Sequence, residues 1–426
     1  MVRFSQIEAS SGIVLLIAAV IALIWANSGW SHTYFSFLDE HIRIEAFSIH
    51  LEETVLEVIN DGLMAIFFFV VGLEIKRELV IGELQDSRAA ALPVLAALGG
   101  MVVPALIYFA FNAGTPVSHG WGIPMATDIA FAVGIVALLG SRVPSGAKLF
   151  LLAVAIADDI GAIAVIAIFY TSDLNAGYLA AAFVGLIIVW LASKVNVRAM
   201  WFYVPAAIAI WYFTLESGVH ATIAGVALGF ITPARPYYKP KEFDERSRAI
   251  LDQYPVEETE DGWSQEHADH EALLLSEIAA EAVAPLNRLE HKLVIWSSMV
   301  IVPIFALANA GVDLRGVGFG EALRSPVALG VALGLIVGKT VGISLASYAA
   351  VRFGLGKLPP RTTWSHVVGL AAVAGIGFTV ALFVTGLAFD DPHATDLAKV
   401  GIFAGSLVAG VIGTALLRRA RPKSEL

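Results

Sequence analysis

Three aspartates and one lysine lie within long apolar stretches, where a charged side chain is costly. They are Asp128, the adjacent pair Asp158 and Asp159, and Lys339. A charge at the centre of a lipid bilayer costs about 2.5–3.5 kcal/mol on insertion scales, so such residues are functional by default. Carboxylate oxygens, with the hydroxyl and carbonyl that Thr127 adds beside Asp128, suit a hard cation. The four charged residues therefore predict a cation site built from oxygens.

The adjacent aspartates also suggest how a cation would exchange with protons. Neighbouring residues of a helix point about 100° apart, so Asp158 and Asp159 cannot both face one point. One plausible division turns one carboxylate toward the cation and the other toward Lys339. Carboxylates crowded in a low-dielectric site titrate as a coupled group, so protons and a cation compete for the same oxygens. If two protons leave for one monovalent cation, the exchange is electrogenic. A buried ion-pair network that only holds helices together is the structural alternative.

The composition places these residues in a membrane. The 426 residues are 58% hydrophobic and only 15% charged, with a mean hydropathy of +0.76. Soluble proteins have about 25% charged residues, so an ordinary cytosolic enzyme is excluded. The net charge of -10 argues against a nucleic-acid partner. The absence of cysteine excludes disulfides and thiolate metal sites.

Twelve apolar stretches predict an all-α integral membrane protein that forms a single domain over residues 1–426. The first, residues 12–25, could also be a signal peptide, but many spans follow it and no clear cleavage site appears. We expect the spans to begin near Gly12, Val58, Ala89, Gly122, Leu149, Leu179, Trp201, Gly218, Leu293, Val327, Val367 and Leu397.

The basic residues orient these spans. Most of the 27 Lys and Arg residues fall in alternate connecting segments and near the two ends of the chain. Because cytoplasmic loops are enriched in Lys and Arg, we expect both termini to be cytoplasmic and the number of spans to be even. Residues 235–284 would then form an acidic cytoplasmic loop, and residues 418–426 a short basic tail.

Two spans carry residues able to interrupt a helix. Pro124 and Asp128 lie in the fourth span, and residues 375–379 (GIGFT) lie in the eleventh. Each is the middle member of a trio of spans, and the two trios have opposite orientations. This pattern is typical of an inverted-repeat transporter with crossed, broken helices at the membrane midplane. Asp128 and Lys339 would compensate the partial charges of the helix ends. Gly and Pro are also common in ordinary membrane helices, which is the alternative.

The tenth span carries a glycine face next to its lysine. Gly330, Gly334 and Gly338 recur every four residues. Small residues at this spacing favour close helix packing, which would place Lys339.

Two extramembrane segments have patterns of their own. Alternating apolar residues between Ile42 and Leu51 suggest a small β-hairpin in the first outer loop, although an irregular loop is equally expected without a Gly turn. Thirteen acidic residues lie between Glu242 and Glu281, which is typical of a solvated, mobile segment. Its end, residues 273–283, could form an amphipathic helix.

Seven short motifs occur in order along nearly the whole chain. They are residues 59–64 (INDGLM), 71–79 (VGLEIKREL), 126–131 (ATDIAF), 157–163 (ADDIGAI), 217–222 (SGVHAT), 305–312 (FALANAGV) and 375–379 (GIGFT). They are very specific in combination, and through them the chain resembles the NhaA family of bacterial sodium/proton antiporters. This family is itself an example of the inverted-repeat transporters.

The resemblance implies roles for the charged residues. Asp159 would be the principal sodium ligand and proton carrier, and Asp158 the second aspartate and partner of Lys339. Thr127 and Asp128 would lie where the broken fourth and eleventh spans cross. The family exchanges more than one proton per sodium ion, accepts lithium and is regulated by pH. It carries no cofactor; the metal ligands, Asp158 and Asp159, would serve the transported ion.

The resemblance also implies a pH-sensing region on the cytoplasmic side and a homodimer formed through the outer hairpin. In the best-studied member a lysine stands where Asn287 is and a histidine where Val294 is, so the pH set-point is not carried over. The pH-sensing residues would be Glu74, Arg77, Glu78, Arg288, Glu290 and His291. The hairpin residues would be Arg43, Ile44, Phe47 and Ile49.

The sequence thus predicts an antiporter of the bacterial inner (plasma) membrane, and not an enzyme. It would export sodium or lithium in exchange for more than one inward proton and serve sodium and pH homeostasis. One alternative is a sodium- or proton-coupled symporter of an organic solute on the same fold, which would need a larger polar or aromatic pocket near the aspartates. Another is an intramembrane aspartyl protease, which needs one carboxylate on each of two helices and a Gly-x-Gly-Asp motif that the sequence lacks.

Overall fold

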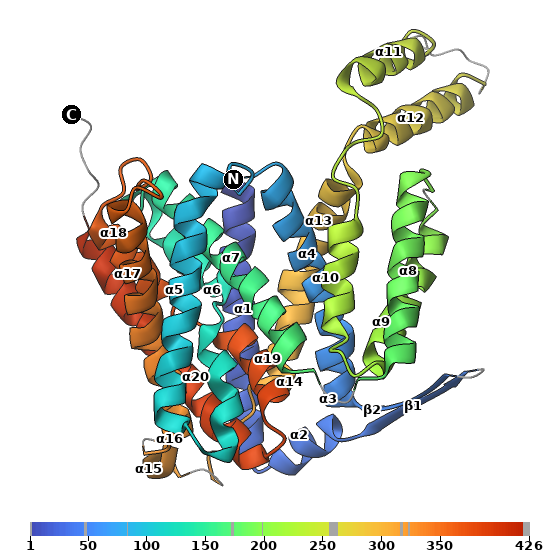
Figure 1. The fold of residues 1–426 in the computed structure, drawn as a ribbon. Coiled ribbons are helices and arrows are strands. Elements are labelled where there is room, and N and C mark those ends of the chain that lie inside the picture. Colours follow the sequence, from blue (N-terminus) through green and yellow to red (C-terminus); the bar gives the residue numbers. More distant parts are fainter. Residues whose placement is uncertain are drawn as a thin grey trace.

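The fold is a bundle of helices that run roughly side by side (Figure 1). The structure is a computed structural model that describes residues 2–46, 49–82, 84–171, 174–197, 199–254, 263–315, 318–322 and 324–420. The chain begins with α1 (Val2–Asn27), α2 (Ser31–Leu38), β1 (His41–Ala46), β2 (Ile49–Thr54), α3 (Val55–Glu57), η1 (Val58–Leu63), α4 (Met64–Val80), α5 (Ser87–Asn112), η2 (Pro116–Met125), α6 (Ile129–Leu138), η3 (Gly140–Arg142), α7 (Ser145–Phe169), α8 (Ala176–Lys194), α9 (Met200–Glu216) and α10 (Thr222–Ile231).

The second part of the chain adds the helices that complete the bundle. We call the end of the bundle where α1 begins the terminal end, and the opposite end, where β1 and β2 lie, the hairpin end. The remaining elements are α11 (Pro240–Leu251), α12 (Trp263–Glu281), α13 (Pro285–Trp296), η4 (Ser297–Ile301), α14 (Val302–Asn309), α15 (Phe319–Ala322), α16 (Pro326–Leu333), η5 (Gly334–Gly338), α17 (Lys339–Arg352), α18 (Trp364–Val373), α19 (Phe378–Ala388) and α20 (Pro392–Arg419).

Most of the expected spans are long apolar helices. Within the described residues, nine helical stretches are long and apolar enough to cross a membrane, and the bent pair α18–α19 would make a tenth. Helices α9, with 17 residues, and α10, with 10, are shorter than the others, whereas a bilayer crossing needs about 20 residues. An all-helical, multi-pass membrane protein is confirmed; the count of twelve spans stays a prediction.

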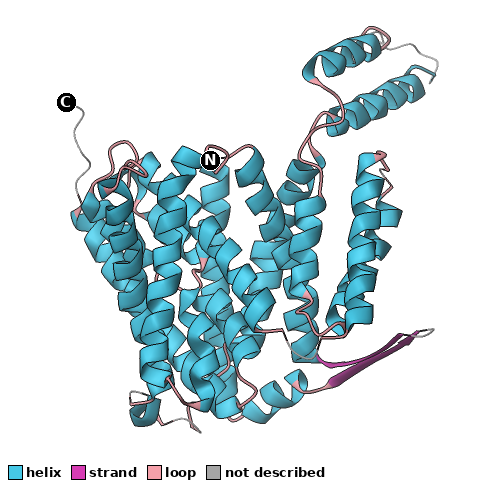
Figure 2. Ribbon diagram, in the orientation of Figure 1, coloured by secondary structure: helices cyan, strands magenta, loops and turns pink. Residues whose placement is uncertain are grey.

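The segment between α2 and α3 contains a two-stranded sheet at the hairpin end (Figure 2). Strands β1 and β2 pair antiparallel, with Arg43 opposite Glu52 and Ala46 opposite Ile49. The side chains of Arg43 and Glu52 form an exposed salt bridge of 2.7 Å. Phe47, expected at a dimer contact, lies outside the described residues. Of Ile44 and Ile49, only the backbone is described.

Both spans expected to break are interrupted. Residues 126–128 are extended between η2 and α6, and α18 meets α19 at a bend of 49°. Glycine occupies the second break because a side chain there would lie too close to neighbouring atoms. A Cβ on Gly375 would contact the carbonyl oxygen of Leu335, and one on Gly377 would lie 2.9 Å from Leu335 Cδ2. These breaks bring polar backbone groups to the interior of the bundle.

Glycines let α5 and α17 approach backbone to backbone. A Cβ on Gly99 would contact Gly342 O, and a Cβ on Gly342 would contact Gly99 O. A Cβ on Gly338 would lie 2.7 Å from Pro104 Cα. Close packing on the glycine face of the tenth span is therefore confirmed, and it seats Lys339 fully buried at the start of α17.

The acidic loop is more ordered than a charge run predicts. It contains the two helices α11 and α12, which lie outside the bundle at its terminal end (Figure 1). Most side chains of these two helices are exposed, as expected of a solvated segment, and its mobility stays a prediction. Pro240 at the first position of α11 and i,i+4 pairs such as Arg248–Asp244, at 3.0 Å, favour the helix. The amphipathic helix expected at residues 273–283 starts earlier, at Trp263.

Candidate functional site

The two interrupted spans are joined by hydrogen bonds at their breaks. Asp128 N donates to Ile376 O at 2.6 Å, and Thr127 Oγ1 donates to Ala374 O at 2.9 Å. Asp128 Oδ2 accepts from the backbone N–H of Thr379 at 3.1 Å and from its hydroxyl at 2.5 Å. Each break therefore satisfies polar groups of the other, as a membrane interior requires.

Asp128 serves both broken helices at once. It is the N-cap of α6, where its Oδ1 accepts from Phe131 N at 3.1 Å. Its Oδ2 meets the first turn of α19 through Thr379. A carboxylate is favourable at a helix N-terminus because it faces the positive end of the helix dipole. One buried negative charge thus faces two helix N-termini.

Lys339 pairs with one of the two adjacent aspartates. Its Nζ donates to Asp158 Oδ2 at 2.5 Å, and both side chains are almost fully buried. Asp158 Oδ1 has no hydrogen-bond partner in the part of the chain that the structure describes. Asp159, the next residue of α7, is 8% exposed. The paired aspartate is held by the lysine, and its neighbour projects in another direction from the same helix.

A second charged cluster lies on α4 and α13. Arg77 forms an ion pair with Glu290, which is 5% exposed, and a longer one of 3.3 Å with Glu78. Glu74 lies one turn earlier on α4, close enough to feel the charges of Arg77, Glu78 and Glu290. The structure thus brings together four of the six residues expected in a pH-sensing region.

The other two residues of that set are placed differently. His291 is exposed but near enough to Glu290 to interact with its charge. Arg288 is partly exposed, and no ion pair is found for it in the described chain. The two charged clusters are connected through space, because Asp159 interacts electrostatically with Glu74 as well as with Asp158 and Lys339.

A cavity lies beside Glu78 of the charged cluster. It has a volume of about 380 Å³ and is lined by α4, α5, α7 and the segment between α4 and α5, with Glu78, Gln85 and Asp86 as its polar residues. Ala153 of α7 also lines it, and Asp159 lies about 9 Å further along the same helix. The polar residues of the cavity are therefore on the α4 and α5 side, and its α7 side is apolar.

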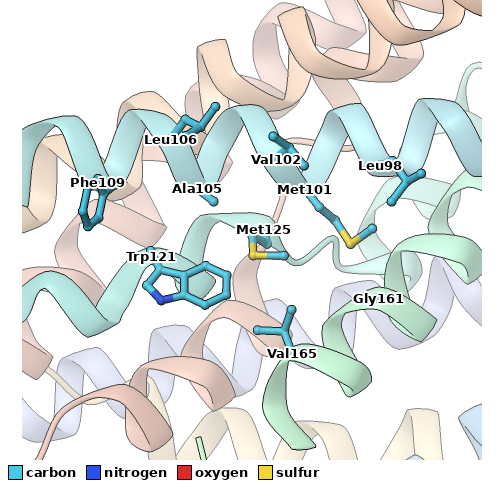
Figure 3. Close-up of a pocket in the computed structure, with 10 residues that line it drawn as sticks. All are labelled: Leu98, Met101, Val102, Ala105, Leu106, Phe109, Trp121, Met125, Gly161 and Val165. Carbon is cyan, nitrogen blue, oxygen red and sulfur yellow. The ribbon is translucent and has the colours of Figure 1, made fainter. Parts of the chain in front are cut away.

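A larger cavity on the other face of α5 is apolar. It has a volume of about 550 Å³, and Met101, Val102, Trp121 and Val165 are among its lining residues (Figure 3). Gly161, one turn beyond Asp158, also borders it. The indole nitrogen of Trp121 is the only side-chain polar atom among the residues drawn. This cavity lacks the polar groups that would recognise an organic solute.

Sequence reasoning did not identify Thr379 as part of the site. The segment Gly375–Thr379 was predicted only to break a helix, and the hydroxyl that binds Asp128 went unassigned. A hydroxyl next to a glycine pair in an apolar span was the available signal. Within the described residues, no group of three or more His, Cys, Asp and Glu could hold a resident metal. Asp158, Asp159 and Thr127 remain the predicted ligands of a transported cation.

Interrupted helices joined at their breaks, beside a buried aspartate pair, are features of an ion transporter. The comparisons with known proteins agree. The family model described as Na+/H+ antiporter 1 matches residues 2–417. The Na(+)/H(+) antiporter NhaA of Oleidesulfovibrio alaskensis is 46% identical over 98% of this chain and 93% of its own length. That of Syntrophobacter fumaroxidans is 43% identical over 99% of this chain and 91% of its own.

The chain therefore belongs to the NhaA family of Na+/H+ antiporters, which are transporters and not enzymes. The solved structure of the sodium proton antiporter MjNhaP1 from Methanocaldococcus jannaschii is similar at a TM-score of 0.48 and 12% identity, with 98% of each chain covered. Nothing in these comparisons supports a symporter of organic solutes.

Proposed function

We propose that the protein exchanges Na+ or Li+ for more than one proton and thereby moves net charge across the membrane. The observation that carries this proposal is the buried Lys339–Asp158 pair directly beside Asp159 at the helix crossing. Two adjacent carboxylates with one lysine can hold either a monovalent cation or protons. Binding of one displaces the other because they share oxygens.

In the proposed cycle, Asp159 binds the cation and carries a proton in its absence. Asp158 supplies a second carboxylate when Lys339 releases it, and Thr127 adds oxygen ligands. Asp128 stays bound to Thr379 and keeps the crossing together. Alternating access then exposes Asp159 to one side at a time, so that protons entering from outside release sodium there.

The proposed orientation places the terminal end in the cytoplasm of a bacterial cell. Twelve crossings of the inner membrane, including the short α9 and α10, would put both termini and α11–α12 on that side. The basic loops at this end support the orientation. The cavity lined by Glu78 and Asp86 would then be the cytoplasmic entrance for sodium.

The cluster around Arg77 is proposed to adjust transport to cytoplasmic pH. Three carboxylates, Glu74, Glu78 and Glu290, surround one guanidinium. Protonation of any of them changes the local charge balance, and Glu74 also feels Asp159. Arg288 and His291 would contribute from the same end of α13. A shifted pH profile in Glu290→Gln, with unchanged maximal rate, is the expected sign.

The sheet of β1 and β2 is proposed to join two copies of the chain. It extends beyond the bundle at the hairpin end (Figure 2), and its outer strand edges are free to pair. Arg43, Ile44, Phe47 and Ile49 would form the contact. Deletion of residues 43–51 should convert a dimer to a monomer in size-exclusion chromatography with light scattering.

Sodium-evoked proton movement in proteoliposomes tests the central proposal. The wild type, Asp159→Asn and Asp244→Asn are reconstituted with an internal pH dye, and Na+, Li+ or K+ is added outside. Asp244 is an exposed aspartate of α11, so its variant is the matched control. Wild type and control should respond to Na+ and Li+ and not to K+, whereas Asp159→Asn should not respond.

An imposed membrane potential separates electrogenic from electroneutral exchange. The rate should change with a valinomycin-set potential if more than one proton moves per cation. A wild type that moves no protons with Na+ at any pH from about 6 to about 9 would overturn the proposal. An unchanged rate under potential would overturn only its stoichiometry.

A further inference from the structure

The first turn of α19 needs hydrogen-bond acceptors that its own sequence does not supply. A helix N-terminus leaves its first N–H groups without partners, and in a membrane interior each such group costs several kcal/mol. The N-cap of α19 is Gly377, which has no side chain. A Cβ there would lie 2.9 Å from Leu335 Cδ2 and 3.1 Å from Ala126 O. The usual Ser, Thr, Asp or Asn cap therefore has no room at this position.

Ser406 of α20 supplies the missing acceptor from a different helix. The backbone N–H groups of Gly377 and Phe378 both donate to Ser406 Oγ at 3.3 Å. The next N–H, that of Thr379, donates to Asp128. Ser406 is 8% exposed. Three consecutive N–H groups of the half-helix are thus satisfied by two side chains from α20 and from the other broken span.

The packing of α20 explains how a short side chain reaches this turn. Gly405, next to Ser406, would place a Cβ 3.1 Å from Ala332 Cα. A Cβ on Gly401, one turn earlier, would lie 2.7 Å from Ala328 O. Glycine on this face brings α20 against α16 and lets the Ser406 hydroxyl reach α19.

We propose that Ser406 is a positioning residue of the ion site. It caps α19 with a neutral oxygen and so fixes Thr379, whose hydroxyl and N–H hold Asp128. Because the cap is uncharged, it satisfies the helix end without adding a second negative charge to the crossing. The contrast with α6 supports this role, since α6 is capped by its own Asp128 and α19 must borrow both of its caps. The inference deepens the proposed function and rests on it for its transport readout.

Removal of the hydroxyl tests the inference against a matched serine. Ser406→Ala deletes the acceptor, and Ser406→Thr restores a hydroxyl. The control is Ser347→Ala in α17, because Ser347 is fully buried and its Oγ has no hydrogen-bond partner in the described chain. Each variant is assayed for the Na+ concentration that gives half-maximal proton movement. Hydrogen exchange of the peptide containing residues 377–379 is measured by mass spectrometry on the purified protein.

Ser406→Ala is expected to raise the half-maximal Na+ concentration roughly five- to tenfold, with faster exchange at residues 377–379. Ser406→Thr should recover most of both values, and Ser347→Ala should stay within about twofold of wild type. If Ser406→Ala does not accumulate in membranes, Ser406→Cys, a weaker acceptor of similar size, replaces it.

The two readouts separate the failure of this inference from that of the proposed function. If hydrogen exchange at residues 377–379 is as slow in Ser406→Ala as in the wild type, Ser406 does not cap α19 and the inference is overturned. If hydrogen exchange becomes faster but the half-maximal Na+ concentration does not change, Ser406 caps α19 without positioning the ion site. That result would also overturn the inference. A wild type that moves no protons would defeat the proposed function, while hydrogen exchange would still decide the cap.

Discussion

Two of the interhelical ion pairs in the described residues differ chiefly in their access to water. Lys339 and Asp158, at the helix crossing, have side chains that are 0% and 2% exposed. Arg77 and Glu290, on α4 and α13, are 30% and 6% exposed. Among the described residues, Lys339 forms its ion pair with Asp158, whereas Arg77 contacts Glu78 in addition to Glu290. The buried pair is therefore closed off from water, although it interacts electrostatically with Asp159, and the second pair is part of a cluster that water reaches.

This difference decides what each pair can do. A charge that loses its partner in a dry interior has no solvent to replace it, so the crossing pair changes state only by exchanging its partner for a proton or a cation. A partly exposed pair exchanges protons with bulk water and is screened by salt. The geometry thus favours transport chemistry at the crossing and regulation at the cluster.

Loss of the buried lysine should have the largest effect. Lys339→Met leaves Asp158 uncompensated, and breaking a buried pair costs about 3–5 kcal/mol. The unfolding temperature of the detergent-solubilised protein should fall markedly. In Lys339→Met/Asp158→Leu both charges are gone, so most of the stability should return although transport does not. If Lys339→Met unfolds at the same temperature as the wild type, the ion pair contributes no stability.

Packing that seats the lysine should matter almost as much. Gly342→Ala places a methyl group against the backbone of Gly99, and overpacking of this kind costs about 1–3 kcal/mol. Gly386→Ala in α19 is the control, because no atom lies within 4 Å of its Cβ position. That control should be neutral or more stable by up to about 1 kcal/mol. Equal unfolding temperatures for the two variants would contradict close α5–α17 packing.

The same contrast explains what the sequence could predict. Asp128, Asp158 and Lys339 were recognisable because a charge inside an apolar run is rare and costly. The breaks at Asp128 and Gly375 were recognisable from residue types that disfavour a continuous helix. In both cases the signal is local, so no knowledge of the tertiary structure was needed.

Apart from the expected pairing of Asp158 with Lys339, contacts between distant residues could not be predicted from residue types alone. Arg77 and Glu290 are 213 residues apart, and charges near helix ends are unremarkable in a sequence. The hydroxyls of Thr379 and Ser406 are ordinary residues of membrane helices until their partners are known. In the acidic loop only the end of α12 was expected, and α11 was missed because the acidic composition was interpreted as disorder, although Glu and Arg are good helix formers.

Removal of Arg77 should have a smaller, salt-dependent effect. Arg77→Gln leaves Glu290 unpaired, but water reaches this end of α4, so we expect a loss of about 1–2 kcal/mol. The salt is choline chloride, because choline is not a proposed substrate cation. Its concentration is raised from about 0.1 to about 1 M, which shortens the Debye length from about 10 to about 3 Å. The difference in unfolding temperature from wild type should shrink. The difference for Lys339→Met should stay constant, and a parallel decrease would remove the distinction between the pairs.

The smallest effect is expected at the sheet, where an acidic group is only partly buried. Burial, and then the charge of Glu57, raise the pKa of Glu53 from its usual 4.5 to about 7. Folding therefore favours the protonated carboxyl, and stability falls as pH rises from about 4.5 to about 7. Glu53→Gln removes this loss. The variant should unfold at a higher temperature than wild type at pH 8.5 and at nearly the same temperature at pH 4.5.

Glu52→Gln is the matched control for this last prediction, since Glu52 neighbours Glu53 and, among the described residues, is paired with the exposed Arg43. It loses a solvated salt bridge, and such pairs contribute little. A gain in Glu53→Gln that is as large at low pH as at high pH would mean that packing of the amide, and not relief of a buried charge, raises the stability. Access to water would then explain the size of the stability effects at Lys339 and Arg77 but not at the sheet.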